Sequence, residues 1–378
     1  MKKIVYIYSN LPAYRKAFFS KLSNSLKSEG IDFSVMYGTL TSKKVVLQDD
    51  SKDYKKIPFK SHSKKAGSIS FTIIEGLYKF FLKEKPDGMV ISYMTTNLTM
   101  LRLVIYCLIH KIPYATWRCG YNRDDYSNIS HKIRSILLRF VERRADFAIT
   151  YGSFYKKKLI EKGLNPNKII IAQNTIDIES IIEKNRDLDR SYSHDITKVL
   201  FVGALIKKKN LDSSIEAIKI LIEDGCNIIF DIVGGGEMLE HLKNLVKEYH
   251  LEDKINIVGP KYGDEVRDYF RTNDIFLSAG LGGLAINEAM AYGLPIISTN
   301  ADWTICDLID GNGYYMEKYG DVDLQVKYLK EFIALTPGQK RKMSERSKDN
   351  ILQRASLAQM VEKHKDVCLK LINEKKES

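Results

Sequence analysis

The sequence predicts an α/β protein with two doubly wound domains that face each other across a cleft. A chain of 378 residues, 44% hydrophobic and 28% charged, has the size and composition of two globular domains. Short β-rich runs alternate with amphipathic helical patterns in both halves, which indicates βαβ units and parallel sheets. We therefore expect an N-terminal domain at 1–178, a linker at 179–197, a C-terminal domain at 198–355, and a final helix at 356–378 that can pack back on the N-terminal domain.

The first half of the chain contains strand and helix patterns in alternation. The predicted strands are Lys3–Ser9, Asp32–Tyr37, Gly88–Tyr93, Pro113–Trp117, Phe147–Tyr151 and Lys168–Gln173. The predicted helices are Tyr14–Ser28, Ile69–Lys83, Thr99–His110, His131–Arg144 and Ser153–Lys162. The lysine-rich stretch Lys43–Lys65 is predicted to be a loop.

The second half repeats this order. Its predicted strands are Val199–Val202, Ile228–Val233, Ile255–Val258, Ile275–Ser278, Pro295–Ser298 and Tyr314–Met316. Its predicted helices are Asn210–Glu223, Glu237–Tyr249, Asp264–Arg271 and Gly283–Tyr292. The polar, weakly periodic segment Ile178–Lys198 favours a linker, and the apolar stripe of Leu357–Leu371 favours the final helix.

Positive charge is concentrated in the first half. Residues 1–180 hold 31 Lys and Arg against 15 Asp and Glu, whereas the rest of the chain holds 28 against 32. This asymmetry indicates that the first half meets nucleic acid, acidic lipid or phosphate, and a solvated lysine-rich surface is the alternative. No recognition motif accompanies the charge, so we expect no nucleic-acid partner.

Several other classes of protein are excluded by the sequence. The best candidate for a membrane span, Leu103–Ile109, is far too short. The first residues read as a strand and not as a signal peptide. The five cysteines are scattered without a Cys-x-x-Cys pair, which favours a reducing cytoplasm over a zinc site. Asp321 and Asp323 open a helix, where aspartate is a natural cap, so we expect no metal.

The segment 273–297 carries the most chemical information. A strand ending at Ser278 is followed by a glycine-rich turn with Gly280 and Gly283, and then by a helix that contains Glu288. Such a turn lets backbone N–H groups and a helix N-terminus approach a phosphate. A carboxylate about one and a half turns into the helix is suited to a ribose diol. The alternative is a plain strand–helix crossover with a glutamate on its surface.

This segment resembles the donor site of the retaining glycosyltransferases of family 4, which have the GT-B fold. In that family two glutamates eight residues apart bracket a glycine-rich turn, and Ala-Met-Ala-x-Gly-x-Pro follows. Residues 289–295 read Ala-Met-Ala-Tyr-Gly-Leu-Pro. The second glutamate is Glu288, whereas the first falls on Gly280.

Landmarks on neighbouring strands extend the resemblance. Phe201–Asp212 looks like the family's first strand and loop of the nucleotide domain, where Lys209 matches the lysine that contacts the donor diphosphate. The other landmarks are Ile232–Glu237, Ile257–Pro260, which matches a stretch that commonly lines the base, and the domain-junction motif Asn174–Asp177. The donor-binding residues that the resemblance implies are Gly203, Lys208, Lys209, Gly259, Pro260, Ser278, Gly280, Gly283, Leu284 and Glu288.

Two departures from the family pattern affect the expected activity. The family's first glutamate, which contacts sugar hydroxyls, is Gly280 here, and an arginine that helps to hold phosphate is Ala204. The chain resembles a subset of polysaccharide enzymes that lack the first acid. Two alternatives stay open: a non-catalytic GT-B homologue that acts as a binding partner, and a GT-B fold nucleotide-sugar epimerase.

The acceptor is expected in the N-terminal half. The candidates are Arg15, after the first strand, and Arg118 and Tyr121, after the fourth strand, where relatives often carry a histidine at the place of Cys119. Arg15 can instead be a surface residue, and Cys119 can be inert packing. Arg118 and Lys209 are the candidates for a catalytic role.

The resemblance implies transfer of a sugar from a nucleotide diphosphate sugar, with a UDP-sugar favoured, to a lipid-linked glycan of a bacterial O-antigen, capsule or exopolysaccharide. In the family's usual account the departing phosphate takes the acceptor proton, so we expect neither a metal nor a cofactor. His131–Arg144 and Tyr155–Ile160 combine apolar faces with cationic edges, which fits an anionic membrane surface as well as a domain core. We therefore expect a cytoplasmic protein on the inner face of the cell membrane.

Overall fold

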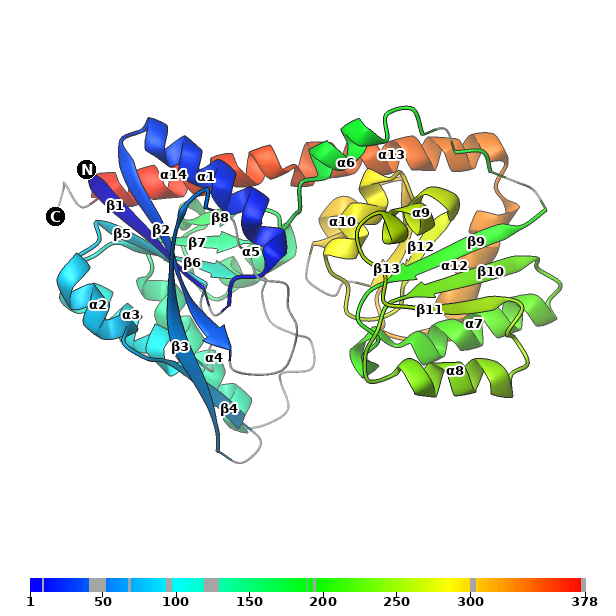
Figure 1. Ribbon diagram of the computed structural model, residues 1–378, viewed down its shortest axis with the longest axis horizontal. Helices are drawn as coiled ribbons and strands as arrows, with labels where there is room; N and C mark the ends of the chain where they lie inside the picture. Colours follow the sequence, from blue (N-terminus) through cyan, green and yellow to red (C-terminus); the bar gives the residue numbers. More distant parts are fainter. Residues whose placement is uncertain are drawn as a thin grey trace. The chain divides into compact units, whose positions relative to one another are not determined.

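The computed structural model describes the chain as two compact units. Its described residues are 1–8, 10–40, 52–66, 69–92, 97–118, 129–188, 190–192, 195–299 and 304–374. Unit 1 consists of Met1–Ile176 and Leu357–Ser378, and unit 2 of Asp177–Ser356 (Figure 1). Each unit is built on a parallel or mostly parallel sheet with helices between the strands, which confirms the predicted α/β class.

The sheet of unit 1 has the strand order β4-β3-β2-β1-β5-β6-β7-β8. Its strands are β1 (Lys2–Tyr8), β2 (Ile31–Leu40), β3 (Lys55–Ala66), β4 (Ile69–Ile74), β5 (Gly88–Ile91), β6 (Tyr114–Arg118), β7 (Phe147–Thr150) and β8 (Ile169–Ile171). All of the recorded pairings are parallel except that of β3 with β4. The carboxyl ends of β1 and of β5 to β8 therefore share one edge of the sheet.

Helices cover both faces of this sheet. One face carries α2 (Leu77–Glu84), α3 (Leu98–Ile109), α4 (Ile129–Arg144) and α5 (Ser153–Glu161), as right-handed crossovers in one direction require. The other face carries α1 (Lys16–Ser28) and α14 (Leu357–Glu374), which contact each other. None of the described helices is both long enough and apolar enough to cross a membrane.

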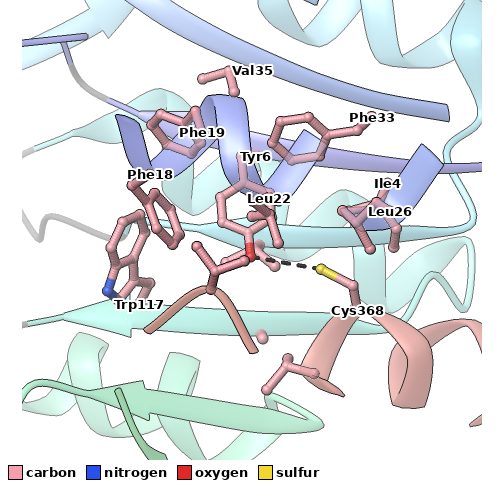
Figure 2. Packing of buried hydrophobic residues seen from close by; sticks show 14 of the residues in the cluster. Ile4, Tyr6, Phe18, Phe19, Leu22, Leu26, Phe33, Val35, Trp117 and Cys368 are labelled. Carbon is pink, nitrogen blue, oxygen red and sulfur yellow. Dashed lines mark hydrogen bonds between the residues drawn. The ribbon is translucent and has the colours of Figure 1, made fainter. Parts of the chain in front are cut away.

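The core under α1 and α14 is rich in aromatic side chains. Tyr6 lies fully buried among Phe18, Phe33 and Trp117, and its hydroxyl lies 3.6 Å from the Cys368 sulfur of α14 (Figure 2). The last helix of the chain thus completes the core of the unit in which the chain begins.

Two sequence predictions in unit 1 were wrong. The predicted loop Lys43–Lys65 ends in strand β3, which pairs with β2 from Lys55 onward, and the predicted helix Ile69–Lys83 begins instead as strand β4. Ile57, Phe59 and Ser61 alternate with exposed residues, so the strand period is present but hidden among lysines. β-branched residues favour extended backbone in β4, and α2 starts only after Gly76, whose φ is +73°.

The sheet of unit 2 has the strand order β11-β10-β9-β12-β13-β14, and all of its recorded pairings are parallel. Its strands are β9 (Thr197–Val202), β10 (Ile228–Val233), β11 (Ile255–Gly259), β12 (Ile275–Ser278), β13 (Ile296–Thr299) and β14 (Gly313–Met316). The order reverses between β9 and β12, and ligands of open α/β sheets bind beyond the carboxyl ends at such a switch point.

Helices surround the sheet of unit 2. They are α6 (Ile178–Lys184), α7 (Leu211–Glu223), α8 (Leu239–Glu248), α9 (Asp264–Thr272), α10 (Leu284–Ala291), α11 (Ile305–Leu308), α12 (Val322–Ala334) and α13 (Pro337–Ala355). Short 3-10 turns are η4 (Lys207–Lys209) in this unit and η1 (Ala13–Arg15) and η3 (Pro166–Lys168) in unit 1.

The segment 179–197, expected as a linker, is part of unit 2. It contains most of α6, which contacts α10 and α13. Its Arg190 is buried and donates through Nε to the Tyr292 carbonyl at 2.9 Å and through its two terminal nitrogens to the carbonyls of Phe270 and Asn273. These carbonyls lie at the C-terminal ends of α9 and α10, which a cation stabilises.

We predict that Arg190→Ala destabilises unit 2 by about 2–4 kcal/mol, because three buried carbonyls lose their donor at once. Urea denaturation followed by circular dichroism measures the change. Arg186→Ala is the matched control, since Arg186 is exposed and pairs only with Glu183 in the described structure. A similar small loss in both variants would contradict the assigned role of Arg190.

Candidate functional site

The carboxyl ends of three neighbouring strands meet in unit 2 through glycines. The N–H of Gly203 donates to the Val233 carbonyl at 3.0 Å, and the N–H of Gly234 donates to the Gly259 carbonyl at 2.9 Å. A Cβ on Gly234 would lie 1.8 Å from the Gly203 oxygen. Only glycine allows the backbones after β9 and β10 to approach this closely.

The glycine-rich turn after β12 lies against the backbone of η4. A Cβ on Gly280 would lie 2.3 Å from the Lys208 oxygen and 2.7 Å from the Lys209 Cα. The N–H of Leu281 donates to the Lys208 carbonyl at 2.8 Å. Position 280 therefore has no room for any side chain in this arrangement, and the family's glutamate could not be accommodated there.

Two side chains fix the carbonyl groups of the turn. The ammonium group of Lys209 donates to the carbonyls of Leu281 and Gly282, the latter at 3.0 Å. The hydroxyl of Thr299 donates to the Gly280 carbonyl at 2.7 Å. With its carbonyls turned toward these donors, the turn is held in one conformation and carries a lysine charge beside it.

Helix α10 begins directly after this turn. The N–H groups of Gly283 and Leu284 donate to no other group in the part of the chain that the structure describes. Free N–H groups at a helix start, together with the positive end of the helix dipole, form a site for an anion. The nearby Lys209 charge strengthens that field.

Glu288 lies on the second turn of α10 and is half-buried. Burial raises the pKa of its carboxyl group, and the charge of Arg267 on α9 opposes that shift. The structure records no hydrogen bond to either carboxylate oxygen from the described residues. A ligand hydroxyl that donates to this carboxylate would therefore satisfy a group that folding leaves poorly solvated.

The structure brings together most of the predicted donor-binding residues. Gly203, Gly280, Gly283 and Leu284 lie at the carboxyl ends of β9 and β12 or directly after them, beside Lys209. The Gly259 carbonyl accepts a hydrogen bond from the N–H of Gly234, which joins Gly259 to this edge. Pro260 is close to Gly235, since a Cβ on Gly235 would lie 3.5 Å from the Pro260 side chain.

Two of the predicted donor-binding residues are placed differently from the others. Lys208 contacts the turn through its backbone carbonyl, and its side chain is exposed. Ser278 is buried inside the sheet beside Ser298, away from solvent. Their side-chain contacts with a donor stay a prediction.

Arg15 in unit 1 is buried instead of being on the surface. It donates to the Tyr151 hydroxyl at 3.2 Å and to the Asn174 side chain at 2.5 Å, and its guanidinium lies over the Trp117 ring at 4.9 Å. Its Nε and Nη1 atoms have no hydrogen-bond partner among the described residues. Because the side chain is 1% exposed, this arrangement favours a role in joining the ends of β1, β7 and β8 over contact with an acceptor.

The other acceptor candidates are only partly described. Arg118 ends β6 and is half-buried, and its charge opposes the burial that raises the pKa of Glu142. Tyr121 and Cys119 lie outside the described residues.

Sequence reasoning missed Thr299 and the contact between Arg15 and Asn174. Thr299 gave no signal because a threonine at the end of a predicted strand is ordinary. Asn174 was noticed as part of a junction motif, but its partner lies 159 positions away, where no local spacing can identify it.

We predict that Gly280→Ala displaces the turn and weakens binding of anionic ligands at the start of α10 by at least about tenfold. The reason is that displacement of the Gly283 and Leu284 N–H groups costs about 1.4 kcal/mol of binding free energy or more. Isothermal titration with a nucleoside diphosphate measures this. Gly338→Ala is the matched control, because a Cβ there meets nothing nearer than 4.0 Å. Unchanged affinity in Gly280→Ala would show that the turn tolerates a side chain.

We predict that Glu288→Gln makes the unliganded protein more stable than the wild type at neutral pH. A pKa raised in the folded state gives stability that is present below the unfolded pKa and lost as pH rises through the folded pKa. The stability of the variant relative to the wild type should therefore increase as pH rises from acid to neutral, and thermal melts at several pH values would detect this increase. Glu216→Gln, on the exposed side of α7, is the control, and an identical pH profile in both variants would contradict the prediction.

Comparison with known proteins identifies the family of this site. Residues 186–350 match the family model described as glycosyl transferases group 1. The amylovoran biosynthesis glycosyltransferase AmsK of Erwinia amylovora is 33% identical over 44% of this chain and 42% of its own length. The putative colanic acid biosynthesis glycosyltransferase WcaL of Salmonella typhimurium is 28% identical over 42% of this chain and 40% of its own length. The chain thus spans about two fifths of these curated relatives in the alignments.

A solved structure matches the whole chain. The crystal structure of HepE of Anabaena in complex with UDP has a TM-score of 0.70 at 13% identity and covers 98% of this chain and 100% of its own. At this identity the match supports the fold alone. Residues 186–350 therefore form a glycosyl transferases group 1 domain, in a chain that has the GT-B fold.

Proposed function

We propose that the chain is a glycosyltransferase that moves a sugar from a nucleotide diphosphate sugar, with a UDP-sugar favoured, to a lipid-linked glycan of a bacterial surface polysaccharide. The observation that carries the proposal is the start of α10, where the Gly283 and Leu284 N–H groups, the Lys209 ammonium and the Glu288 carboxyl lie on adjoining segments. The first three suit a diphosphate, and the last suits a ribose diol.

The chemistry follows from where negative charge develops. The acceptor hydroxyl bonds to the anomeric carbon, the bond from that carbon to the phosphate oxygen breaks, and the nucleoside diphosphate leaves with the bonding electrons. The helix start and Lys209 stabilise this leaving group because their positive field is fixed before the reaction. On the family resemblance, the departing phosphate takes the acceptor proton, the anomeric configuration is retained, and no metal is required.

The known relatives support the choice of pathway and donor. AmsK and WcaL are named for the biosynthesis of amylovoran and colanic acid, both polysaccharides, which supports a polysaccharide product. The HepE complex contains UDP, which supports a uridine donor. A lipid-linked acceptor would place the protein on the cytoplasmic face of the membrane, in keeping with the positive first half of the sequence.

Gly280 and Ala204 favour a second candidate, a non-catalytic homologue that binds nucleotide sugar. The close packing at Gly280 explains the missing glutamate as part of this turn's geometry. This packing indicates that the turn is formed around glycine and is not an active turn that has lost a functional residue. We therefore prefer the enzyme.

We predict that one of UDP, GDP, dTDP and CMP raises the melting temperature, with UDP the expected one. A ligand at about 100 times its Kd stabilises by about 2.7 kcal/mol, which corresponds to a shift of a few degrees for a protein of this size. The shift should be absent in Glu288→Gln and kept in Glu216→Gln.

The donor sugar is then identified by turnover. UDP-sugars are incubated with an extract of lipid-linked glycans, and released UDP is measured. Nucleotide binding with no turnover of any sugar would favour the non-catalytic homologue. UDP release or a new nucleotide sugar in the absence of acceptor would favour an epimerase or hydrolase. The absence of a thermal shift with every nucleotide would reject the proposed site.

A further inference from the structure

The outer side of the α2, α3 and α4 layer of unit 1 is unusually apolar for an exposed surface. We call it the α2–α4 face. It is defined by the exposed side chains Tyr78, Leu82, Leu98, Ile105, Ile109, Ile136 and Phe140. The large exposed hydrophobic side chains elsewhere in the described chain are Met1, Tyr14, Ile160 and Tyr262. A gathering of such residues on one layer indicates an interaction surface.

The helical periodicity of α3 places one stripe outward. Leu98, Arg102, Ile105 and Ile109 follow one another at four, three and four residues and are all exposed, with Ile109 69% exposed. The opposite side of the helix is buried in the core with α2 and with Leu138 of α4. The apolar stripe is therefore additional to the residues that fold the domain.

The neighbouring helices continue this face. On α2, which contacts α3, Tyr78 and Leu82 are exposed one turn apart. On α4, Ile136 and Phe140 are exposed one turn apart, and Ile136 is 67% exposed. α2, α3 and α4 lie on the same side of the sheet (Figure 1).

The exposed charges on α2, α3 and α4 are of one sign. The exposed cations of these helices are Lys79, Lys83, Arg102, Arg139, Arg143 and Arg144, and the exposed Glu75, which precedes α2, pairs with His62. The two acidic residues of these helices do not balance them: Glu84 is half-buried and pairs with Lys3, and Glu142 is buried and accepts from the Tyr155 hydroxyl at 2.6 Å. Within the described part of α2, α3 and α4, no acidic side chain is fully exposed.

We infer that the α2–α4 face lies on a bilayer that contains anionic lipids, with its aliphatic and aromatic side chains in the headgroup region and its cations at the phosphates. This combination fits a lipid surface better than nucleic acid, whose phosphates would leave the isoleucines without contacts. The biological role of this contact rests on the proposed function, since the surface would bring the enzyme to a lipid-linked acceptor.

This location differs from the one expected from sequence. The predicted stretch Tyr155–Ile160 falls on α5, where Tyr155 and Leu159 are buried in a core cluster. Only the stretch His131–Arg144, now α4, is part of the α2–α4 face. The contributions of α2 and α3 become visible only once burial separates their inner from their outer side chains.

Vesicle flotation of the full chain tests the inference. The probes are vesicles of phosphatidylcholine alone and of phosphatidylcholine with an equal amount of phosphatidylglycerol. We expect flotation with the anionic vesicles and not with the neutral ones. Ile105→Ser with Ile109→Ser should weaken binding by at least about tenfold, because two apolar side chains no longer enter the interface.

A charge variant separates the two contributions. Replacing Lys79, Lys83 and Arg102 by glutamine should weaken binding by about fivefold per cation removed. Tyr262→Ser and the double change Lys243→Gln with Lys247→Gln, all at exposed positions of unit 2, are the matched controls and should bind as the wild type does. Thermal melts verify that each variant is folded.

Each contrary result overturns the inference. Failure of the wild type to float would reject it, and unchanged flotation of the isoleucine variant would show adsorption by charge alone. Self-association that the isoleucine changes abolish, without flotation, would assign the face to a second copy of the chain. Glu288→Gln should float as the wild type does, so failure of the nucleotide site leaves this test intact.

Discussion

The candidate site depends on the close approach of two backbones, those of the turn at Gly280 and of η4 at Lys208 and Lys209. This approach requires that residue 280 have no Cβ. It places the Lys209 side chain where its ammonium reaches two carbonyls of the turn, and it aligns the turn so that α10 starts with open N–H groups. The candidate anion site is thus a consequence of backbone packing at the switch point of the sheet.

Burial has opposite consequences for two charged residues of unit 2. Arg190 is buried but donates to three carbonyls, so its charge stabilises the ends of α9 and α10. Glu288 is half-buried without a recorded donor among the described residues, and burial raises the pKa of its carboxyl group. A charged group that lacks a partner and weakens the free protein is more typical of a candidate binding site than of a structural core.

Unit 1 combines an aromatic core with a surface that is both apolar and cationic. Its core is completed by α14, where the Nδ1 atom of His364 lies 2.9 Å from the Tyr6 hydroxyl. Burial lowers the pKa of His364 well below its usual value, and the charge of Arg15 lowers it further. The helices α2, α3 and α4 pack on the other face of the sheet through a separate cluster, and their outer stripes are exposed.

The sequence alone determined the alternation of strands and helices and the α/β class. It also determined the position of the glycine-rich turn and named Lys209 and Glu288 as candidate residues beside it. These features rest on local periodicity, on residues that change backbone conformation, and on motifs that are contiguous in the chain. Strand β3 was missed because lysines obscured its period of two, and the edge strand β4 was missed because its residues were assigned to a helical pattern. Only the tertiary structure decided that position 280 has no room for a side chain, that Arg15 is buried against Trp117 and Asn174, and that the exposed apolar side chains gather on one layer of helices. Each of these depends on which distant segments meet, and burial and contact between residues far apart in the chain leave no trace in local spacing.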